Sequence, residues 1–316
     1  MAGQPRLIAG HIVAADGYRL PLHRWPATGR NAAVVLGLHG FNDHGGGFEA
    51  LGQALSPRGI SLYAYDQRGF GATAGVGGWP GNEVLMSDAR AAAGLLRQRY
   101  PETPLYLLGT SMGGAVALLA MTGAGADANS STAAIPPVAG TILLAPAVLG
   151  RPVMPGYQRF GLWLGERLAP GLPVSVRIAH ALGYHPTDQP EVIDELRADP
   201  LVPNHTRVAA AAGLVDLMDA ALLAAPGLQH PTLLLYGAKD DLVPVGAICA
   251  LLDGVAKHGE HWQVSIYPDG FHLLTRYSGA HRTYADIEAW LLEPEARDAS
   301  PRFVGPRQAE HQLCRN

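Results

Sequence analysis

The segment Leu105-Tyr-Leu-Leu-Gly-Thr-Ser-Met-Gly-Gly-Ala-Val-Ala-Leu-Leu-Ala120 joins two predicted elements through a sharp turn. Its first four residues are apolar and predict a strand buried on both faces, whereas the Ala- and Leu-rich part from Met112 onward predicts a helix. The junction reads Gly109-Thr-Ser111-Met-Gly113, a G-x-S-x-G pattern whose glycines relieve crowding. Such a turn pushes the Ser111 side chain outward at the head of a helix, where unpaired N–H groups favour a developing negative charge. We interpret it as a nucleophile elbow.

Two other interpretations of this segment are less favourable. Gly and Ser are common in turns, so a five-residue pattern also arises by chance. The stretch from Tyr106 to Ala126 carries no charge and has the length of a membrane span. Its centre, however, is a Gly/Ser/Thr cluster, and its apolar strength is low on both sides. The strand-turn-helix context therefore favours the elbow.

The composition indicates a globular protein without a nucleic-acid partner. The 316 residues are 48% hydrophobic and 16% charged, with a net charge of −4 and no run of Lys or Arg. The two cysteines, Cys249 and Cys314, are far apart and fit no disulfide framework or zinc pattern, which favours a reducing compartment. The first residues lead into no long apolar segment, so we expect no secretion signal. These features predict a cytoplasmic protein, with peripheral membrane contact as an option.

Short apolar runs alternate with helical patterns along most of the chain. A hairpin is predicted around Asp16-Gly17. The alternation predicts an α/β fold with a mainly parallel, doubly wound sheet. The predicted strands are residues 32–38, 60–65, 105–108, 138–144, 231–236 and 263–267, and the main predicted helices are residues 83–100, 245–257 and 280–292.

Residues 150–227 interrupt this alternation with helical patterns broken by prolines, and predict a cap over the active site. We expect a core first part at 1–149, the cap at 150–227, a core second part at 228–293 and a loosely packed tail at 294–316. Residues 124–137 are predicted to form a loop of small residues. The cap carries an apolar stripe that predicts core packing, an acyl pocket or lipid contact: Tyr157, Phe160, Trp163 and Leu164.

A serine hydroxyl needs a base, and the base needs an acid partner. His272 lies in a loop five residues after the last predicted strand, at a sheet edge where ligands bind in α/β folds. Asp240 and Asp241 follow the preceding predicted strand. We choose Asp240 as the acid, because its place three residues after Gly237 should direct it to the histidine loop, and expect Asp241 to cap the turn or meet solvent. The chain order of serine, acid and histidine fits this assignment.

An oxyanion formed on the substrate needs two hydrogen-bond donors. The elbow offers the backbone N–H of Met112, the residue after the nucleophile. The loop after the first central strand offers the N–H of Phe41, because the small Gly40 before it permits close approach. We expect His39 to be a structural, hydrogen-bonded residue.

The motifs together resemble the α/β-hydrolases, and most closely the branch of monoacylglycerol lipases and lysophospholipases related to serine aminopeptidase-like hydrolases. The resemblance implies Ser111 as nucleophile, Asp240 as acid, His272 as base, and Phe41 and Met112 as oxyanion donors. Thr110 and the Gly45-Gly-Gly47 run depart from the pattern of many relatives. The motifs that carry it are His39-Gly-Phe-Asn-Asp-His44, Tyr65-Asp-Gln-Arg-Gly-Phe-Gly71, Gly109-Thr-Ser-Met-Gly-Gly114, Gly237-Ala-Lys-Asp240 and Gly270-Phe-His272.

The predicted function is a serine ester hydrolase that acts on a small or single-chain acyl ester through an acyl-enzyme. An aminopeptidase or amidase on the same triad is the alternative enzyme, and a non-catalytic ligand-binding domain is the alternative outside enzymes. Glu166, Glu191 and Glu195 could recognise an amino group, although solvated helix faces explain them better. We expect no cofactor and no metal. The G-x-G-x-x-A match at Gly69–Ala74 lacks the helix that a dinucleotide site requires. The oligomeric state is left open.

Overall fold

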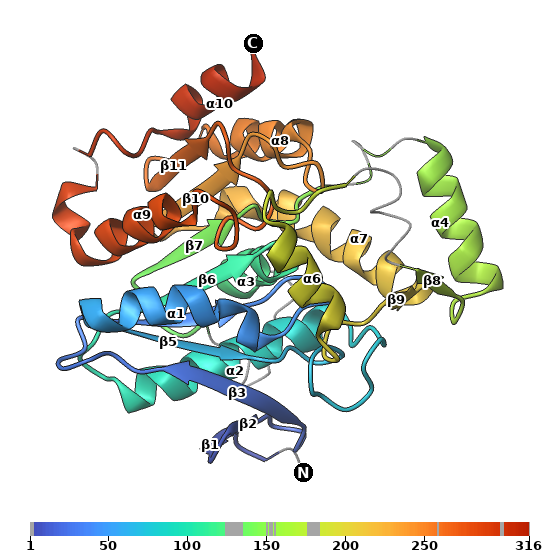
Figure 1. Ribbon diagram of the computed structural model, residues 1–316, viewed down its shortest axis with the longest axis horizontal. Helices are drawn as coiled ribbons and strands as arrows, with labels where there is room; N and C mark the ends of the chain where they lie inside the picture. The colour runs from blue at the N-terminus through green and yellow to red at the C-terminus, as the bar shows by residue number, and fades with distance from the viewer. Residues whose placement is uncertain are drawn as a thin grey trace.

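In the computed structural model, a mixed β-sheet runs through the middle of the molecule (Figure 1). The structure describes residues 3–123, 135–149, 151, 154, 156–175, 184–257, 259–297 and 300–315. Within them the main sheet has nine strands in the order β1-β2-β3-β5-β4-β6-β7-β10-β11. The strands are β1 (Arg6–Ile8), β2 (His11–Val13), β3 (Arg19–Trp25), β4 (Ala33–Leu38), β5 (Ile60–Tyr65), β6 (Leu105–Thr110), β7 (Gly140–Leu144), β10 (Thr232–Gly237) and β11 (Trp262–Tyr267).

The sheet is parallel from β5 to β11 and antiparallel at the β1–β3 edge. Its central strands are apolar and buried, because a parallel sheet is covered on both faces. The predicted hairpin at Asp16-Gly17 and the predicted parallel, doubly wound sheet are both confirmed. The predicted loop at residues 124–137 lies mostly outside the described residues.

Helices cover both faces of the sheet and bury two separate apolar clusters (Figure 1). One cluster contains side chains of α1 and α9, and the other contains side chains of α2, α3, α7 and α8. The core helices are α1 (Glu49–Leu55), α2 (Asn82–Arg99), α3 (Met112–Thr122), α8 (Val245–Val255) and α9 (Ala280–Leu292), and short 3-10 turns lie at Gly45–Phe48, Ser56–Arg58, Ala225–Gly227 and Pro294–Ala296.

Between β7 and β10 the chain inserts a mainly helical segment, residues 150–227, which we call the insertion. Its described elements are α4 (Gly156–Leu168), β8 (Pro173–Ser175), α6 (Pro190–Ala198), β9 (His205–Arg207) and α7 (Val208–Ala224). Strands β8 and β9 form a two-stranded antiparallel sheet of their own. Helix α7 packs against α3. The stretch Val208–Gly227 is long and apolar enough to cross a membrane, but its buried side chains belong to the core cluster, so we interpret it as a core helix.

The C-terminal segment packs firmly, so the prediction of a loose tail at 294–316 is wrong. Val304 forms a β-bridge with Val264 of β11, and Phe303 is buried beside it. The Arg297 guanidinium lies 3.9 Å from the Trp290 ring centroid and donates a hydrogen bond to the Trp290 carbonyl. Helix α10 (Pro306–Cys314) then packs on α8. These contacts lie between segments distant in sequence, which the charged, Pro-rich composition of the tail does not reveal.

A disulfide between Cys249 and Cys314 joins α8 to the end of α10, so the expectation of unpaired cysteines is wrong. The partners are 65 residues apart in sequence, and the fold brings their Cα atoms to 5.9 Å. Disulfides persist mainly in oxidising compartments, so the cysteines no longer support a reducing one.

Replacing both cysteines by serine is expected to lower the free energy of unfolding by about 2–4 kcal/mol, because the bond restricts the unfolded chain. Urea unfolding of the parent and of Cys249→Ser/Cys314→Ser measures this loss. Two free thiols in the purified parent, or equal unfolding midpoints, would contradict the assignment.

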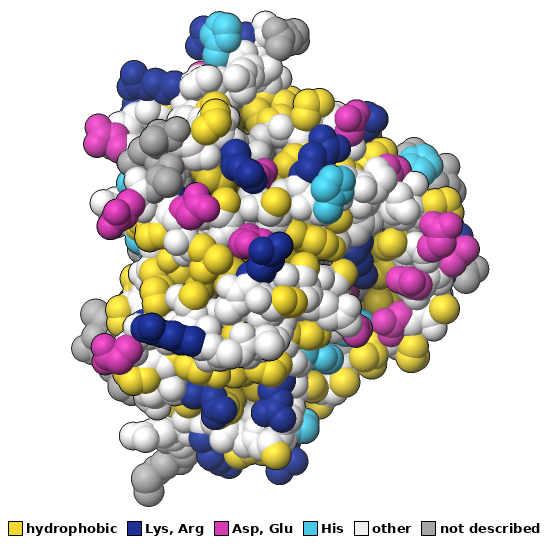
Figure 2. Space-filling model, turned by 60° about the vertical axis from the view of Figure 1, so that its left-hand side comes forward, with side chains coloured by type: hydrophobic (Ala, Val, Ile, Leu, Met, Phe, Trp, Pro, Cys, Tyr) yellow, Lys and Arg dark blue, Asp and Glu magenta, His cyan; other side chains and the backbone are white. Residues whose placement is uncertain are grey.

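The surface mixes both signs of charge. Figure 2 shows Lys and Arg side chains interspersed with Asp and Glu across the face that it displays, between areas of apolar side chains. This face offers no continuous basic surface.

Candidate active site

The predicted nucleophile lies at the junction of β6 and α3 in a backbone conformation that side chains rarely adopt. Ser111 has φ 51° and ψ −118°. The flanking glycines permit this, since a Cβ at Gly113 would lie 1.9 Å from the Leu38 carbonyl oxygen and a Cβ at Gly109 would lie 2.3 Å from the Gly113 carbonyl oxygen. Strand β6 and helix α3 therefore meet at a distance that only glycine allows, as a nucleophile elbow requires.

The structure brings Asp240 and His272 together. His272 Nδ1 lies 2.7 Å from Asp240 Oδ2, and both side chains are about 5% exposed or less. The carboxylate accepts a hydrogen bond from the Nδ1–H group, which leaves Nε2 as the ring nitrogen that can take a proton from another group. Asp240 Oδ1 accepts the N–H groups of Leu242 and Val243, which fixes the carboxylate in its turn.

Of the two roles expected for Asp241, capping the turn or meeting solvent, it does not cap the turn, and it is half-buried. Its Oδ2 accepts the N–H of His185 in the insertion, and its Oδ1 is buried without a partner among the described residues. Asp240 both caps the turn and holds the histidine. Two adjacent carboxylates in a polar turn give no sequence signal that would separate these roles.

The three predicted triad residues follow the carboxyl ends of strands in one parallel sheet. Ser111 follows β6, Asp240 follows β10 and His272 follows β11, in the strand order β6-β7-β10-β11. A Cβ at Gly237 would lie 2.4 Å from the Gly270 carbonyl carbon, so the loops that carry Asp240 and His272 touch. This edge is where ligands bind in open α/β sheets.

The loop after β4 approaches the elbow closely. A Cβ at Gly40 would lie 3.5 Å from Ser111 Cβ. His39 Nδ1 donates a hydrogen bond to the Gly40 carbonyl oxygen at 2.8 Å, and its Nε2 accepts the N–H of Gln67 at 2.8 Å. In a trans peptide the C=O and the next N–H point in opposite directions, so the bond to Gly40 directs the Phe41 N–H away from the His39 ring. Among the described residues that N–H has no hydrogen-bond partner.

The ring of His39 is neutral and held in one tautomer. Its side chain is fully buried, and burial lowers the pKa of the imidazole from its ordinary value of 6.5. Both ring nitrogens form hydrogen bonds with backbone groups, which agrees with the structural role expected for His39.

Stability is expected to fall in mild acid because of His39. The unfolded state binds a proton near pH 6.5 and the folded state only at lower pH, so the contribution of the buried neutral ring is complete above pH 6.5 and declines below it. The stability difference between the parent and His39→Gln, measured by urea unfolding, should shrink from pH 7.5 to pH 5.5. If this stability difference does not change with pH, the imidazole of His39 has the same pKa in the folded and unfolded states.

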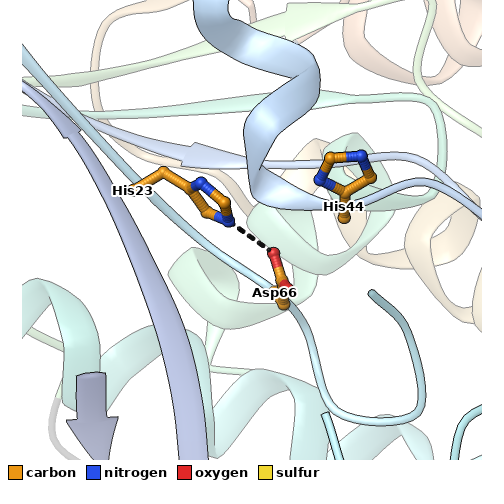
Figure 3. A group of neighbouring side chains, drawn as sticks. All are labelled: His23, His44 and Asp66. Carbon is orange, nitrogen blue, oxygen red and sulfur yellow. Dashed lines mark hydrogen bonds and ion pairs between the residues drawn. The ribbon is translucent and has the colours of Figure 1, made fainter. Parts of the chain in front are cut away.

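Next to this loop, His23, His44 and Asp66 place three ligand-type atoms within 4.8 Å of one another (Figure 3). A divalent cation prefers such atoms, but each is already hydrogen-bonded. Asp66 Oδ1 lies 2.9 Å from His23 Nε2 and accepts the N–H of Gly45, and His44 Nδ1 accepts the N–H of Gly46. Burial tends to raise the pKa of Asp66. The hydrogen bonds that its carboxylate forms with His23, Gly45 and Ala72 outweigh burial and lower the pKa to about 2. The cluster is built as a hydrogen-bond network that anchors the loop.

A cavity of about 550 Å³ lies between α2, α4 and α7, near Trp79. Three carboxylates line it: Glu83, Glu166 and Asp216. The Trp79 ring lies 6.4 Å from the Phe41 ring, so an aromatic contact links this cavity to the loop beside Ser111. None of the predicted triad residues lines it.

Comparison with known proteins places the chain in a family. The family described as serine aminopeptidase, S33 (Hydrolase_4) matches residues 29–276. The chain belongs to this family of α/β-hydrolases. The monoacylglycerol lipase of Mycolicibacterium smegmatis is 30% identical over 89% of this chain and 95% of its own. Human monoglyceride lipase is 27% identical, over 90% and 91%. The solved monoacylglycerol lipase of Paleococcus ferrophilus has a TM-score of 0.68 at 21% identity, over 86% and 98%.

Family membership confirms the resemblance drawn from the motifs and the α/β-hydrolase fold. Some residues of these motifs have contacts that the sequence analysis did not predict. Asn42, Asp43 and His44 stand inside a quoted motif but were given no role, although all three make contacts described below. The partners of Asn42 and His44 lie in the insertion, 164 and 155 residues away in sequence, and the partner of Asp43 is Arg276, so no local pattern identifies them.

Proposed function

We propose that the chain hydrolyses carboxylic esters of single-chain acyl groups, with Ser111 as nucleophile, His272 as base and Asp240 as acid. The observation that carries this proposal is the buried 2.7 Å contact between His272 and Asp240, at the same sheet edge as the strained elbow of Ser111. Ester hydrolysis is also the activity of the relatives, which are named monoacylglycerol lipases.

In the proposed reaction, His272 Nε2 takes the Ser111 hydroxyl proton as Oγ attacks the ester carbonyl carbon. The carbonyl oxygen becomes an oxyanion, which accepts hydrogen bonds from the N–H groups of Phe41 and Met112. His272 then gives the proton to the departing alcohol, and the acyl group stays on Ser111. Water, deprotonated by His272, then attacks the acyl-enzyme. His272 returns this proton to Ser111 Oγ as the carboxylic acid leaves. Asp240 holds the ring tautomer and stabilises the imidazolium in both halves.

We further propose that the insertion, with the predicted limits 150–227, acts as a cap and meets lipid through α4. The apolar stripe on α4 is not core packing: Tyr157 is 75% exposed, Phe160 61% and Trp163 48%. Its opposite side packs on α7, where a Cβ at Gly165 would lie 3.2 Å from Val208. A helix with one packed side and one exposed aromatic side suits contact with a lipid surface.

The experiment that tests the function compares substrates. We expect turnover of p-nitrophenyl butyrate and of 1-monoacylglycerols, with a rate that depends on acyl length because the shape of the cap should set that preference. An amino-acid p-nitroanilide should be a poor substrate. Preference for the anilide would favour the aminopeptidase, and no turnover of either would favour a binding protein. Glu191 and Glu195 are exposed on α6, as residues of a solvated helix face would be.

A further inference from the structure

Residues 41–44, which we call the oxyanion loop, are bonded directly to the insertion. Asn42 Nδ2 donates to Thr206 Oγ1 of β9 at 2.5 Å. His44 Nε2 donates to Asp199 Oδ2, at the end of α6, at 2.9 Å. Thr206 is 9% exposed, so solvent offers its hydroxyl little alternative. Two side chains of the insertion thus accept hydrogen bonds from a loop of the core.

The opposite side of the loop is held by the core. Asp43 Oδ2 accepts from Arg276 Nη2 at 2.9 Å, and Arg276 follows the loop of His272. The Gly45 N–H donates a hydrogen bond to the buried Asp66. The core therefore holds the loop at Asp43 and just after its end at Gly45, and the insertion holds it at Asn42 and His44.

Asn42 is the residue next to Phe41, and its backbone is in the left-handed region with φ 56°. Non-glycine residues adopt this conformation rarely, so surrounding contacts help to maintain it. The hydrogen bond to Thr206 is such a contact. If it is lost, the backbone at Asn42 can relax. Phe41, whose N–H lies in the preceding peptide, can then shift with it.

We propose that Thr206 and Asp199 are positioning residues that hold the Phe41 N–H in the oxyanion hole, so that docking of the insertion completes the catalytic site. The proposal rests on the proposed function, because it assigns the donor role to Phe41. A displacement of about 1 Å at such a position can cost about a hundredfold in rate, whereas binding of the ground-state ester changes little.

The test replaces Thr206 by Val, which keeps the shape and removes the acceptor, and by Ser, which keeps the hydroxyl. With p-nitrophenyl butyrate, Thr206→Val is expected to lower kcat about tenfold to a hundredfold, with KM within about twofold. An alkylboronic acid, which forms a tetrahedral anion on the serine, should bind the variant more weakly by the same factor. Thr206→Ser should stay within about threefold of the parent.

The same comparison applies to Asp199. Asp199→Ala removes the acceptor of the His44 hydrogen bond, and Asp199→Asn retains one oxygen. We expect Asp199→Ala to lower kcat about tenfold and Asp199→Asn to retain most of it. Asp194→Ala is the matched control, since Asp194 lies on the same helix with a side chain that is 76% exposed, and this variant should keep the parental rate.

A double-mutant cycle separates this bond from other effects of the insertion. Asn42→Gly accepts the left-handed backbone and removes the donor, so Asn42→Gly/Thr206→Val should lose no more kcat than the more impaired single variant. Additive losses, or a raised KM with unchanged kcat and unchanged boronate binding, would overturn the proposal. A parent that hydrolyses no ester would instead overturn the proposed function, so the two failures are distinct.

Discussion

Replacing Ser111 by Ala is expected to lower kcat for p-nitrophenyl butyrate by about four to six orders of magnitude, because no oxygen remains to attack the ester carbonyl. A residual rate above that of water should persist, since the oxyanion donors and the binding surface stay intact. The elbow backbone tolerates the change: alanine adds no atom to a site in which Ser111 already has φ 51°.

Substrate binding provides the control for this variant. The Ser111→Ala protein should unfold at the same urea concentration as the parent and should still bind the monoacylglycerol substrate, measured by calorimetry. Hydrolysis at the parental rate would exclude Ser111 as nucleophile. Loss of folding together with activity would call for Ser111→Cys as a second variant, which keeps a nucleophilic atom.

Replacing Asp240 by Asn is expected to lower kcat by about 10⁴-fold, measured with the same ester. The amide can donate a hydrogen bond to His272 Nδ1, which favours the tautomer with its proton on Nε2 and removes the acceptor that Ser111 needs. Because the 2.7 Å contact between His272 Nδ1 and Asp240 is buried, water cannot replace the lost carboxylate as the acceptor for Nδ1.

Asp241 offers a matched control one residue away. Its Oδ2 accepts the His185 N–H, and no contact joins it to His272 among the described residues. Asp241→Asn should therefore stay within about threefold of the parental kcat. Similar losses in both variants would show that the charge of the turn matters and not the contact to His272.

The sequence contains enough information to predict the fold and to propose the nucleophile, because local physics favours both. Apolar runs of four to seven residues define the strands, and a G-x-S-x-G pattern at a strand-helix junction has few conformations. Gly113 illustrates this: the 1.9 Å approach of Leu38 leaves no room for any other residue. The choice of Asp240 over Asp241 needed the family spacing, since both sit in the same turn.

Contacts between distant segments could not be predicted. The disulfide of Cys249 with Cys314 depends on where α10 docks, and docking depends on Phe303 and Val304 reaching β11. The bond from Asn42 to Thr206 likewise exists only because the insertion lies over the oxyanion loop. Composition and periodicity describe one segment of the chain at a time, so they do not predict which residues of two distant segments come into contact.

The central claim is that the Ser111 hydroxyl is the nucleophile. Incubation with a fluorophosphonate, which phosphonylates activated serines, followed by peptide mass spectrometry, tests it most directly. We predict a single adduct on the peptide that contains Ser111, formed as ester hydrolysis is lost, and a much slower reaction in Asp240→Asn. An adduct on another residue with loss of activity, or an unlabelled Ser111 in the inactivated protein, would contradict the account.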